Sequence, residues 1–141
     1  MIAVDTNVLV YANRGESVVQ QAARLALHEL AAGGGSWAVP WPCVHEFLSM
    51  VTNPKVFCNP VAMPVALEYV HSLASRGGAR FIGEGPEHLA TLRRISGTIV
   101  GPRIHDARIA AICLDHGVSE LWTADRDFSY FPLLRTRNPL V

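Results

Sequence analysis

The chain of 141 residues begins, after Met1, with Ile2-Ala3-Val4-Asp5-Thr6-Asn7-Val8-Leu9, in which an acid separates two apolar runs. The first run is typical of a short buried strand. The second, which continues to Ala12, is typical of a short helix capped by Thr6 or Asn7. Asp5 therefore stands at the carboxyl end of a strand and at the start of a helix.

Short apolar runs and helical patterns continue to alternate along the rest of the chain. Strands are expected at 37–40, 79–82 and 121–124, with a weak fifth near Thr136, helices at 17–32, 42–51, 63–75, 86–95 and 104–115, and loops at 13–16 and 52–60. Strands that alternate with helices predict a parallel sheet covered on both faces. We expect one three-layer α/β/α domain over residues 1–141 with a short central parallel sheet, because a chain of this length builds one core.

The composition excludes several classes of protein. Half of the residues are hydrophobic and 17% are charged, which argues against disorder. The 12 Lys and Arg balance the 12 Asp and Glu, so neither a polybasic nucleic-acid arm nor a basic membrane anchor is expected. Three cysteines without a Cys-x-x-Cys pair favour a reducing cytoplasm over a disulfide scaffold. No apolar run is long enough to span a membrane, and an acid at position 5 comes too early for a signal peptide.

Four acids occupy positions where a solvated carboxylate is not expected. Asp5 and Asp125 follow apolar strands, at the edge of the sheet where open α/β folds bind ligands. Glu46 and Asp106 each share a helix face with apolar residues, in the first turns of their predicted helices. A buried carboxylate must be protonated, paired or bound to a cation. We therefore expect the four side chains to meet in one crevice.

Each acid also has an ordinary structural explanation when it is taken alone. Asp5 and Asp106 both suit a helix N-cap. Glu46 suits an ion pair with an arginine, and Asp125 suits a turn residue. Because all four are expected at one edge of the sheet, a shared site explains them better than four separate roles.

The acids lie within four motifs that keep a fixed order. These are Val4-Asp5-Thr6-Asn7-Val8-Leu9, His45-Glu46-Phe47, His105-Asp106-Ala107-Arg108-Ile109-Ala110-Ala111 and Thr123-Ala124-Asp125-Arg126-Asp127-Phe128. Together they resemble the PIN domain, over essentially the whole chain, and within that superfamily the VapC toxins of toxin–antitoxin pairs. Thr52-Asn53-Pro54-Lys55-Val56-Phe57 also resembles a segment of one VapC subgroup.

The resemblance implies a metal-dependent endoribonuclease, the toxin of a type II toxin–antitoxin pair, which a cognate VapB-type antitoxin holds inactive. It also implies a homodimer. By position, the catalytic and metal-binding acids are Asp5, Glu46, Asp106 and Asp125, of which Asp5 and Asp106 are the principal metal ligands. Asn7 and Thr123 are supporting polar residues by the same resemblance, and Asp127 is a fifth acid whose role varies within the family.

Phosphodiester hydrolysis is a reaction for which a cluster of carboxylates that binds a divalent ion is suited. Mg²⁺ and Mn²⁺ are hard ions that take oxygen ligands, and a divalent ion both activates water and neutralises phosphate oxygens. Zero net charge predicts weak non-specific RNA binding, which favours recognition of a structured tRNA or rRNA by shape. Arginines near the acids in sequence are either phosphate ligands or surface ion-pair partners: Arg14, Arg103, Arg108 and Arg126.

Two other functions remain open at this point. A haloacid-dehalogenase-like phosphatase also places an acid such as Asp5 after its first strand, but it needs a second Asp at the position of Asn7 and a suitably placed Lys, and Lys55 is the only Lys. A non-catalytic RNA- or protein-binding module on the same fold is the other alternative. Loss of one of the acids would be its usual sign, and all four are present.

Overall fold

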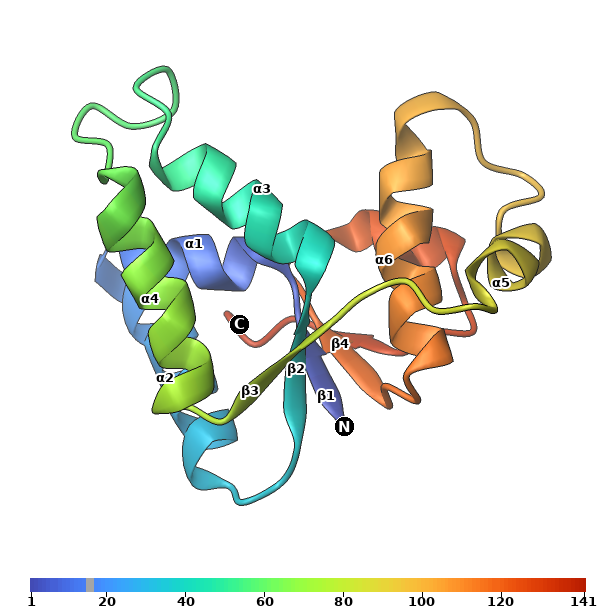
Figure 1. Ribbon diagram of the computed structural model, residues 1–141, viewed down its shortest axis with the longest axis horizontal. Coiled ribbons are helices and arrows are strands. Elements are labelled where there is room, and N and C mark those ends of the chain that lie inside the picture. The colour runs from blue at the N-terminus through green and yellow to red at the C-terminus, as the bar shows by residue number, and fades with distance from the viewer. Residues whose placement is uncertain (15–16) are drawn as a thin grey trace.

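The computed structural model describes residues 1–14 and 17–141, which form an open sheet with helices on both sides (Figure 1). The strands are β1 (Ile2–Val4), β2 (Trp37–Pro40), β3 (Ala79–Ile82), β4 (Glu120–Trp122) and β5 (Thr136–Arg137). The helices are α1 (Thr6–Arg14), α2 (Ser17–Ala32), α3 (Trp41–Val51), α4 (Met63–Ser75), α5 (His88–Ile95) and α6 (Ile104–Asp115), with short 3-10 helices η1 (Gly101–Arg103) and η2 (Arg126–Tyr130). The predicted α/β class with a short parallel sheet is confirmed.

The sheet is parallel throughout, in the order β3-β2-β1-β4-β5. β1 is central, and its Ala3 pairs with Ala38 of β2 and Leu121 of β4. This register brings the carboxyl ends of β1 and β4 side by side, because Val4 pairs with Trp122 and the backbone N–H of Asp5 donates to the Trp122 carbonyl at 3.0 Å. Residues that follow these two strands are therefore neighbours.

Helices cover the sheet in two groups. α1 packs against α2 and α3, and α3 packs against α4, whereas α5 and α6 pack together on the other side of the molecule (Figure 1). The core between them is made of fully buried side chains such as Leu9, Phe47 and Leu121. No helix within residues 1–14 and 17–141 is both long and apolar enough to cross a membrane.

The start of α1 differs from the prediction. The helix begins at Thr6, so Thr6 and Asn7 lie in its first turn and neither caps it. The reason is that Asp5 takes the position before the helix, where its carboxylate accepts the Thr6 backbone N–H at 2.8 Å. The helix also extends through Arg14, into the loop predicted at 13–16, of which residues 15–16 lie outside the described chain.

Two further boundaries shift for local reasons. The helix predicted from Pro86 begins at His88, because the His88 N–H donates to the Gly85 carbonyl at 3.1 Å and closes a turn over the two residues between. The strand predicted at 121–124 is β4 at Glu120–Trp122. Thr123 therefore lies just past the strand end, where its side chain belongs to the site.

Candidate active site

The four predicted acids line one cavity of about 270 Å³ at the carboxyl end of the sheet, hereafter the acid pocket. Asp5 follows β1 and Asp125 follows β4, while Glu46 comes from α3 and Asp106 from α6. α3 and α6 lie on opposite sides of these strand ends (Figure 1). The apolar part of the wall comes from Val10, Tyr11, Met50 and Phe57. The sequence thus brings together acids that are up to 120 residues apart.

Asp5 is the buried acid of the group, with 5% of its surface exposed. Its Oδ1 accepts the Thr6 N–H at 2.8 Å and the Cys43 thiol at 3.4 Å. Its Oδ2 accepts the Thr123 hydroxyl at 2.7 Å and the Asn7 amide at 3.2 Å. All four partners are donors, which is the environment of a carboxylate and not of a protonated acid.

Thr123 and Asn7 are themselves oriented by the backbone. The Thr123 hydroxyl oxygen accepts the Asp125 N–H at 2.9 Å, so its proton is directed to Asp5. The Asn7 side-chain oxygen accepts the Ala124 N–H at 3.0 Å, so its amide nitrogen turns to Asp5 and Thr123. The loop after β4 therefore fixes which way two side chains donate to the buried carboxylate.

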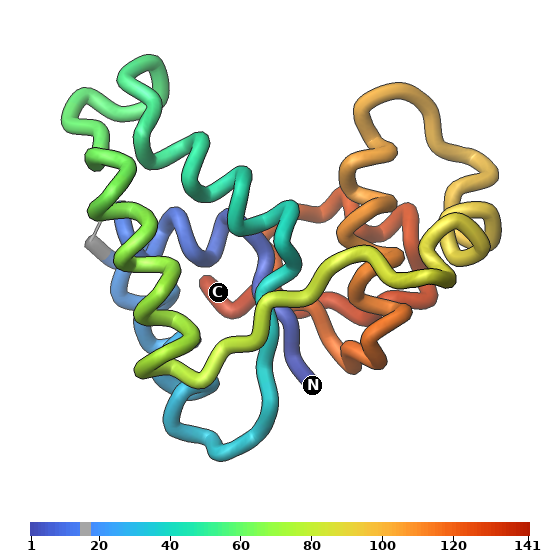
Figure 2. Tube along the Cα trace, viewed as in Figure 1, coloured from blue at the N-terminus to red at the C-terminus, as the bar shows by residue number. Residues whose placement is uncertain are grey.

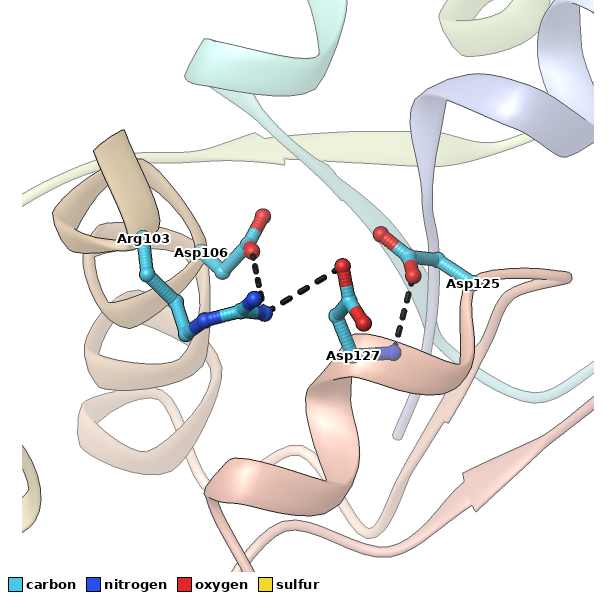
Figure 3. A network of polar contacts seen from close by, with 4 residues as sticks. All are labelled: Arg103, Asp106, Asp125 and Asp127. Carbon is cyan, nitrogen blue, oxygen red and sulfur yellow. Dashed lines mark hydrogen bonds and ion pairs between the residues drawn. The ribbon is translucent and has the colours of Figure 1, made fainter. Parts of the chain in front are cut away.

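Asp106, Asp125 and Asp127, hereafter the outer acids, lie closer to solvent. Asp106 and Asp125 are half-buried and Asp127 is exposed. One ligand oxygen from each lies within 4.8 Å of the other two. Asp125 also accepts the Asp127 N–H at 2.8 Å, which folds η2 back toward the pocket (Figure 3).

A cation from this chain lies beside two of the outer acids. Arg103 lies 3.2 Å from an Asp127 oxygen and 3.9 Å from an Asp106 oxygen (Figure 3). The first distance is a close ion pair, and the second is at the outer limit of one. Asp106 is thus not locked in a tight pair with Arg103, and its carboxyl remains part of the pocket wall.

Glu46 differs from the expectation. It is exposed rather than buried on the apolar face, and as the sixth residue of α3 it lies in the second turn of the helix. Its carboxyl nonetheless faces the acid pocket. The contribution of a helix N-terminus to its stability is therefore smaller than the sequence suggested.

Burial and mutual repulsion raise the pKa of three of the acids. The pKa of Asp5 is raised by burial and by the charge of Asp125, against the lowering effect of its donors. Loss of water and the charges of Asp5 and Asp106 raise the pKa of Glu46. Burial and the charges of Asp125 and Asp5 raise the pKa of Asp106. Arg103 lowers the pKa of Asp106, but by less than burial and the acidic neighbours raise it.

These residues fit a hard divalent cation, since every candidate ligand is a carboxylate oxygen and the repulsion among them is what such a cation relieves. Among the described residues, the closest grouping with metal-ligand spacing is that of the outer acids. This grouping includes Asp127 and leaves out Asp5 and Glu46, whereas the family resemblance gave Asp5 and Asp106 as the principal metal ligands. The hydrogen bonds that hold Asp5 explain the difference, because its carboxylate is drawn toward Thr123 and Asn7.

Two contributors were not identified from the sequence. Cys43 carried no functional expectation from the sequence, yet its thiol donates to Asp5. Arg103 was one of four arginines near the acids, and nothing in the sequence separated it from Arg108, which instead pairs with Glu84 at 2.9 Å. Both contacts join segments far apart in the chain, which no local pattern reveals.

Comparison with known proteins agrees with this arrangement. The family model described as "PIN domain" matches residues 2–133. Ribonuclease VapC48 of Mycobacterium tuberculosis is 31% identical over 137 residues, which cover 96% of this chain and 94% of that protein. Among solved structures, VapBC2 from Rickettsia felis, bound to a DNA fragment from its promoter, has a TM-score of 0.70 at 20% identity and 98% coverage of both chains.

A second solved structure is that of Mycobacterium tuberculosis VapC20, a toxin that cleaves the sarcin-ricin loop. Its TM-score is 0.62 at 15% identity, with 92% of this chain and 93% of that chain covered. The family match spans most of the chain and concerns PIN nucleases, not the phosphatases that Asp5 alone left open. This chain belongs to the PIN-domain family and, within it, to the VapC ribonucleases.

Proposed function

We propose that this protein is a metal-dependent endoribonuclease and the toxin of a type II toxin–antitoxin pair. The observation that carries the proposal is the convergence of four carboxylates from β1, α3, α6 and the end of β4 on one pocket, with the buried one held by four donors. Its relatives over nearly the whole chain are named ribonucleases. VapC20, which has a similar fold, is described as a sarcin-ricin loop cleaving toxin, and by analogy with it we propose a structured tRNA or rRNA as the substrate class.

In this proposal the acids bind the metal ion, and the neighbouring polar residues orient them. Asp5, Glu46, Asp106 and Asp125 hold Mg²⁺ or Mn²⁺, with Asp127 as a further acid beside them. When bound, the ion lowers the pKa of water and neutralises charge on the phosphate that is cleaved. Asn7 and Thr123 keep the Asp5 carboxylate oriented.

Glu46 has a distinct place in this arrangement. It is exposed at the pocket, and loss of water and the charges of Asp5 and Asp106 raise its pKa, which makes its carboxylate a stronger base. Its carboxylate is therefore suited to accept a proton from the attacking water at the pocket edge. Asp5 is buried and therefore less open to solvent than Glu46.

The chain would act as one domain over residues 1–141 and as a homodimer, in the cytoplasm where its RNA substrate is found. Its partner would be a VapB-type antitoxin. Solved VapBC complexes with the same fold support this partner, among them VapBC2 of Rickettsia felis.

The test is incubation of the purified protein with total cellular RNA in Mg²⁺, in Mn²⁺ and in chelator, beside an Asp5→Asn variant. Metal-dependent cleavage that is lost in the variant supports the proposal. Hydrolysis of phosphomonoesters alone would favour a phosphatase. Saturable RNA binding without cleavage would favour a non-catalytic module.

A further inference from the structure

A second cleft of about 490 Å³ opens beside the acid pocket, hereafter the flanking cleft. It shares Asp106 with the acid pocket, so the two hollows meet at that side chain. Arg103, Asp127 and Tyr130 form its polar wall, and loop residues 98–102 before α6 supply apolar surface. A polymer whose phosphate lies at the acids is therefore adjacent to this cleft.

The guanidinium of Arg103 lies over an aromatic ring. Its central carbon is 4.1 Å from the centroid of the Tyr130 ring, while Asp127 pairs with it at 3.2 Å. Asp127 and Tyr130 both belong to η2, and Arg103 ends η1, so contacts between two short segments hold the guanidinium in place. An arginine fixed in this way presents a planar surface that needs little ordering on binding.

Two side chains in the wall of the flanking cleft expose large apolar surfaces. Tyr130 is 51% exposed and Val100 is 83% exposed, although both are large hydrophobic residues. The loop that carries Val100 and the loop after α3 project on the same side of the molecule (Figure 2). Exposed aromatic rings and arginine planes are the surfaces on which single-stranded nucleic acids stack their bases.

The charge of the flanking cleft indicates what kind of contact it makes. Arg103 is balanced by Asp127 and lies near Asp106, so the cleft has no excess of positive charge with which to attract phosphates. Its binding surface is the stacked pair of Arg103 and Tyr130 with the apolar loop beside it. These features suit a nucleobase better than a phosphate group.

We propose that the flanking cleft binds the nucleotide next to the cleaved phosphodiester, with its base stacked on the Arg103–Tyr130 pair. This inference rests on the proposed ribonuclease function. Arg103 and Tyr130 are then substrate-positioning residues, which set where the RNA lies relative to the acids. The planar guanidinium is required, because a lysine keeps the charge but not the stacking surface.

The experiment measures RNA binding separately from cleavage. Fluorescence anisotropy follows end-labelled bulk tRNA in Ca²⁺ with the wild type, Arg103→Ala, Arg103→Lys, Tyr130→Leu and Tyr130→Phe. Arg108→Ala is the matched control, since Arg108 has its own carboxylate partner in Glu84. We expect Kd to rise about tenfold or more in Arg103→Ala, Arg103→Lys and Tyr130→Leu, and to change little in Tyr130→Phe and Arg108→Ala.

Cleavage of total RNA then tests the ribonuclease function separately from the nucleotide site in the flanking cleft. Absence of any Asp5-dependent cleavage by the wild type would count against the proposed function, and the binding series would still decide the nucleotide site. Normal binding by folded Arg103→Ala and Tyr130→Leu would overturn the site alone, as would equal weakening in the Arg108→Ala control. Normal RNA binding with a weakened complex with a co-expressed antitoxin would assign the cleft to a protein partner and would also overturn it.

Discussion

Asp5 and Asp127 lie at the same end of the sheet, but the protein treats them in opposite ways. Asp5 is buried and accepts four hydrogen bonds, two of them from side chains that the backbone orients. Asp127 is exposed and pairs with Arg103 across the opening of the site. The site thus has a rigid inner half and an outer half that the solvent reaches.

The difference between the two acids shows that the fold loses stability at Asp5 and not at Asp127. Burying a carboxylate without a counter-charge destabilises a protein, and hydrogen bonds recover only part of that cost. A chain under selection for stability alone would place an apolar residue or a neutral cap at position 5. An exposed ion pair such as Asp127–Arg103 changes stability little, by about 0–1 kcal/mol. Substitutions in the two halves should therefore have very different effects.

The largest effect is expected from Asp5→Asn, which keeps the size of the side chain but removes its charge. Metal-dependent RNA cleavage should fall by more than about a hundredfold, because changes one contact further from a metal already cost about 10–100-fold. The measurement is the initial rate of cleavage at saturating RNA. Asp115→Asn is the control, since Asp115 accepts a hydrogen bond from Thr91 at the far end of α6. An equal fall in cleavage rate in Asp5→Asn and Asp115→Asn would show that Asp5 has no special role in catalysis.

Thr123→Val tests whether orientation of Asp5 matters, with nearly the same side-chain shape. The hydroxyl that donates to Asp5 and accepts from Asp125 is lost, so the buried carboxylate loses its shortest hydrogen bond. We expect kcat to fall about 10–100-fold with a smaller change in KM. Thr123→Ser, which keeps the hydroxyl, should recover most of the rate. A Thr123→Val variant with wild-type kcat would show that Asp5 needs no such support.

The positions of Asp5 and Asp125 were predictable from the sequence because they follow from strand periodicity. An apolar run that ends in an acid places that acid at the carboxyl edge of a parallel sheet, and both Asp5 and Asp125 are found there. Asp106 was predictable from its helix face. Each inference needed only residues within about seven positions.

The ion pair of Arg103 and the exposure of Glu46 could not be predicted in the same way. The ion pair of Arg103 with Asp127 joins residues 24 positions apart and depends on how η1 and η2 pack beside α6. The exposure of Glu46 depends on where α1, α4 and α6 pack against α3, which the helical pattern of α3 alone does not show. Long-range packing decides both features, and the local sequence is compatible with several outcomes.

The third prediction concerns stability against pH. An acid whose pKa is higher in the folded than in the unfolded protein stabilises the fold below its unfolded pKa, and this stabilisation is lost as pH rises through the folded pKa. Asp5, Glu46 and Asp106 all belong to this case, with ordinary values of 3.8 for Asp and 4.5 for Glu. In chelator, their contribution should therefore decline as pH rises from about 4.5 toward neutrality.

Divalent cations should reverse this decline, because a cation replaces the protons that the acids would otherwise hold. The increase in melting temperature caused by millimolar Mg²⁺ or Mn²⁺ should be small near pH 5 and larger near pH 7.5. Differential scanning fluorimetry at both pH values measures it, and Asp106→Asn should reduce the increase. A melting temperature that neither ion changes at any pH would contradict metal binding by these acids.

The smallest effect is expected from Asp127→Asn. The substitution removes the ion pair with Arg103 but keeps the backbone N–H that donates to Asp125, so the turn that positions Asp125 is retained. Cleavage should fall less than about tenfold, and the loss should appear in KM, because Arg103 is less firmly held against Tyr130. Steady-state kinetics on one labelled RNA would separate KM from kcat. If kcat falls as far in Asp127→Asn as in Asp5→Asn, then Asp127 is an essential ligand, and the exposed acid is as important for catalysis as the buried one.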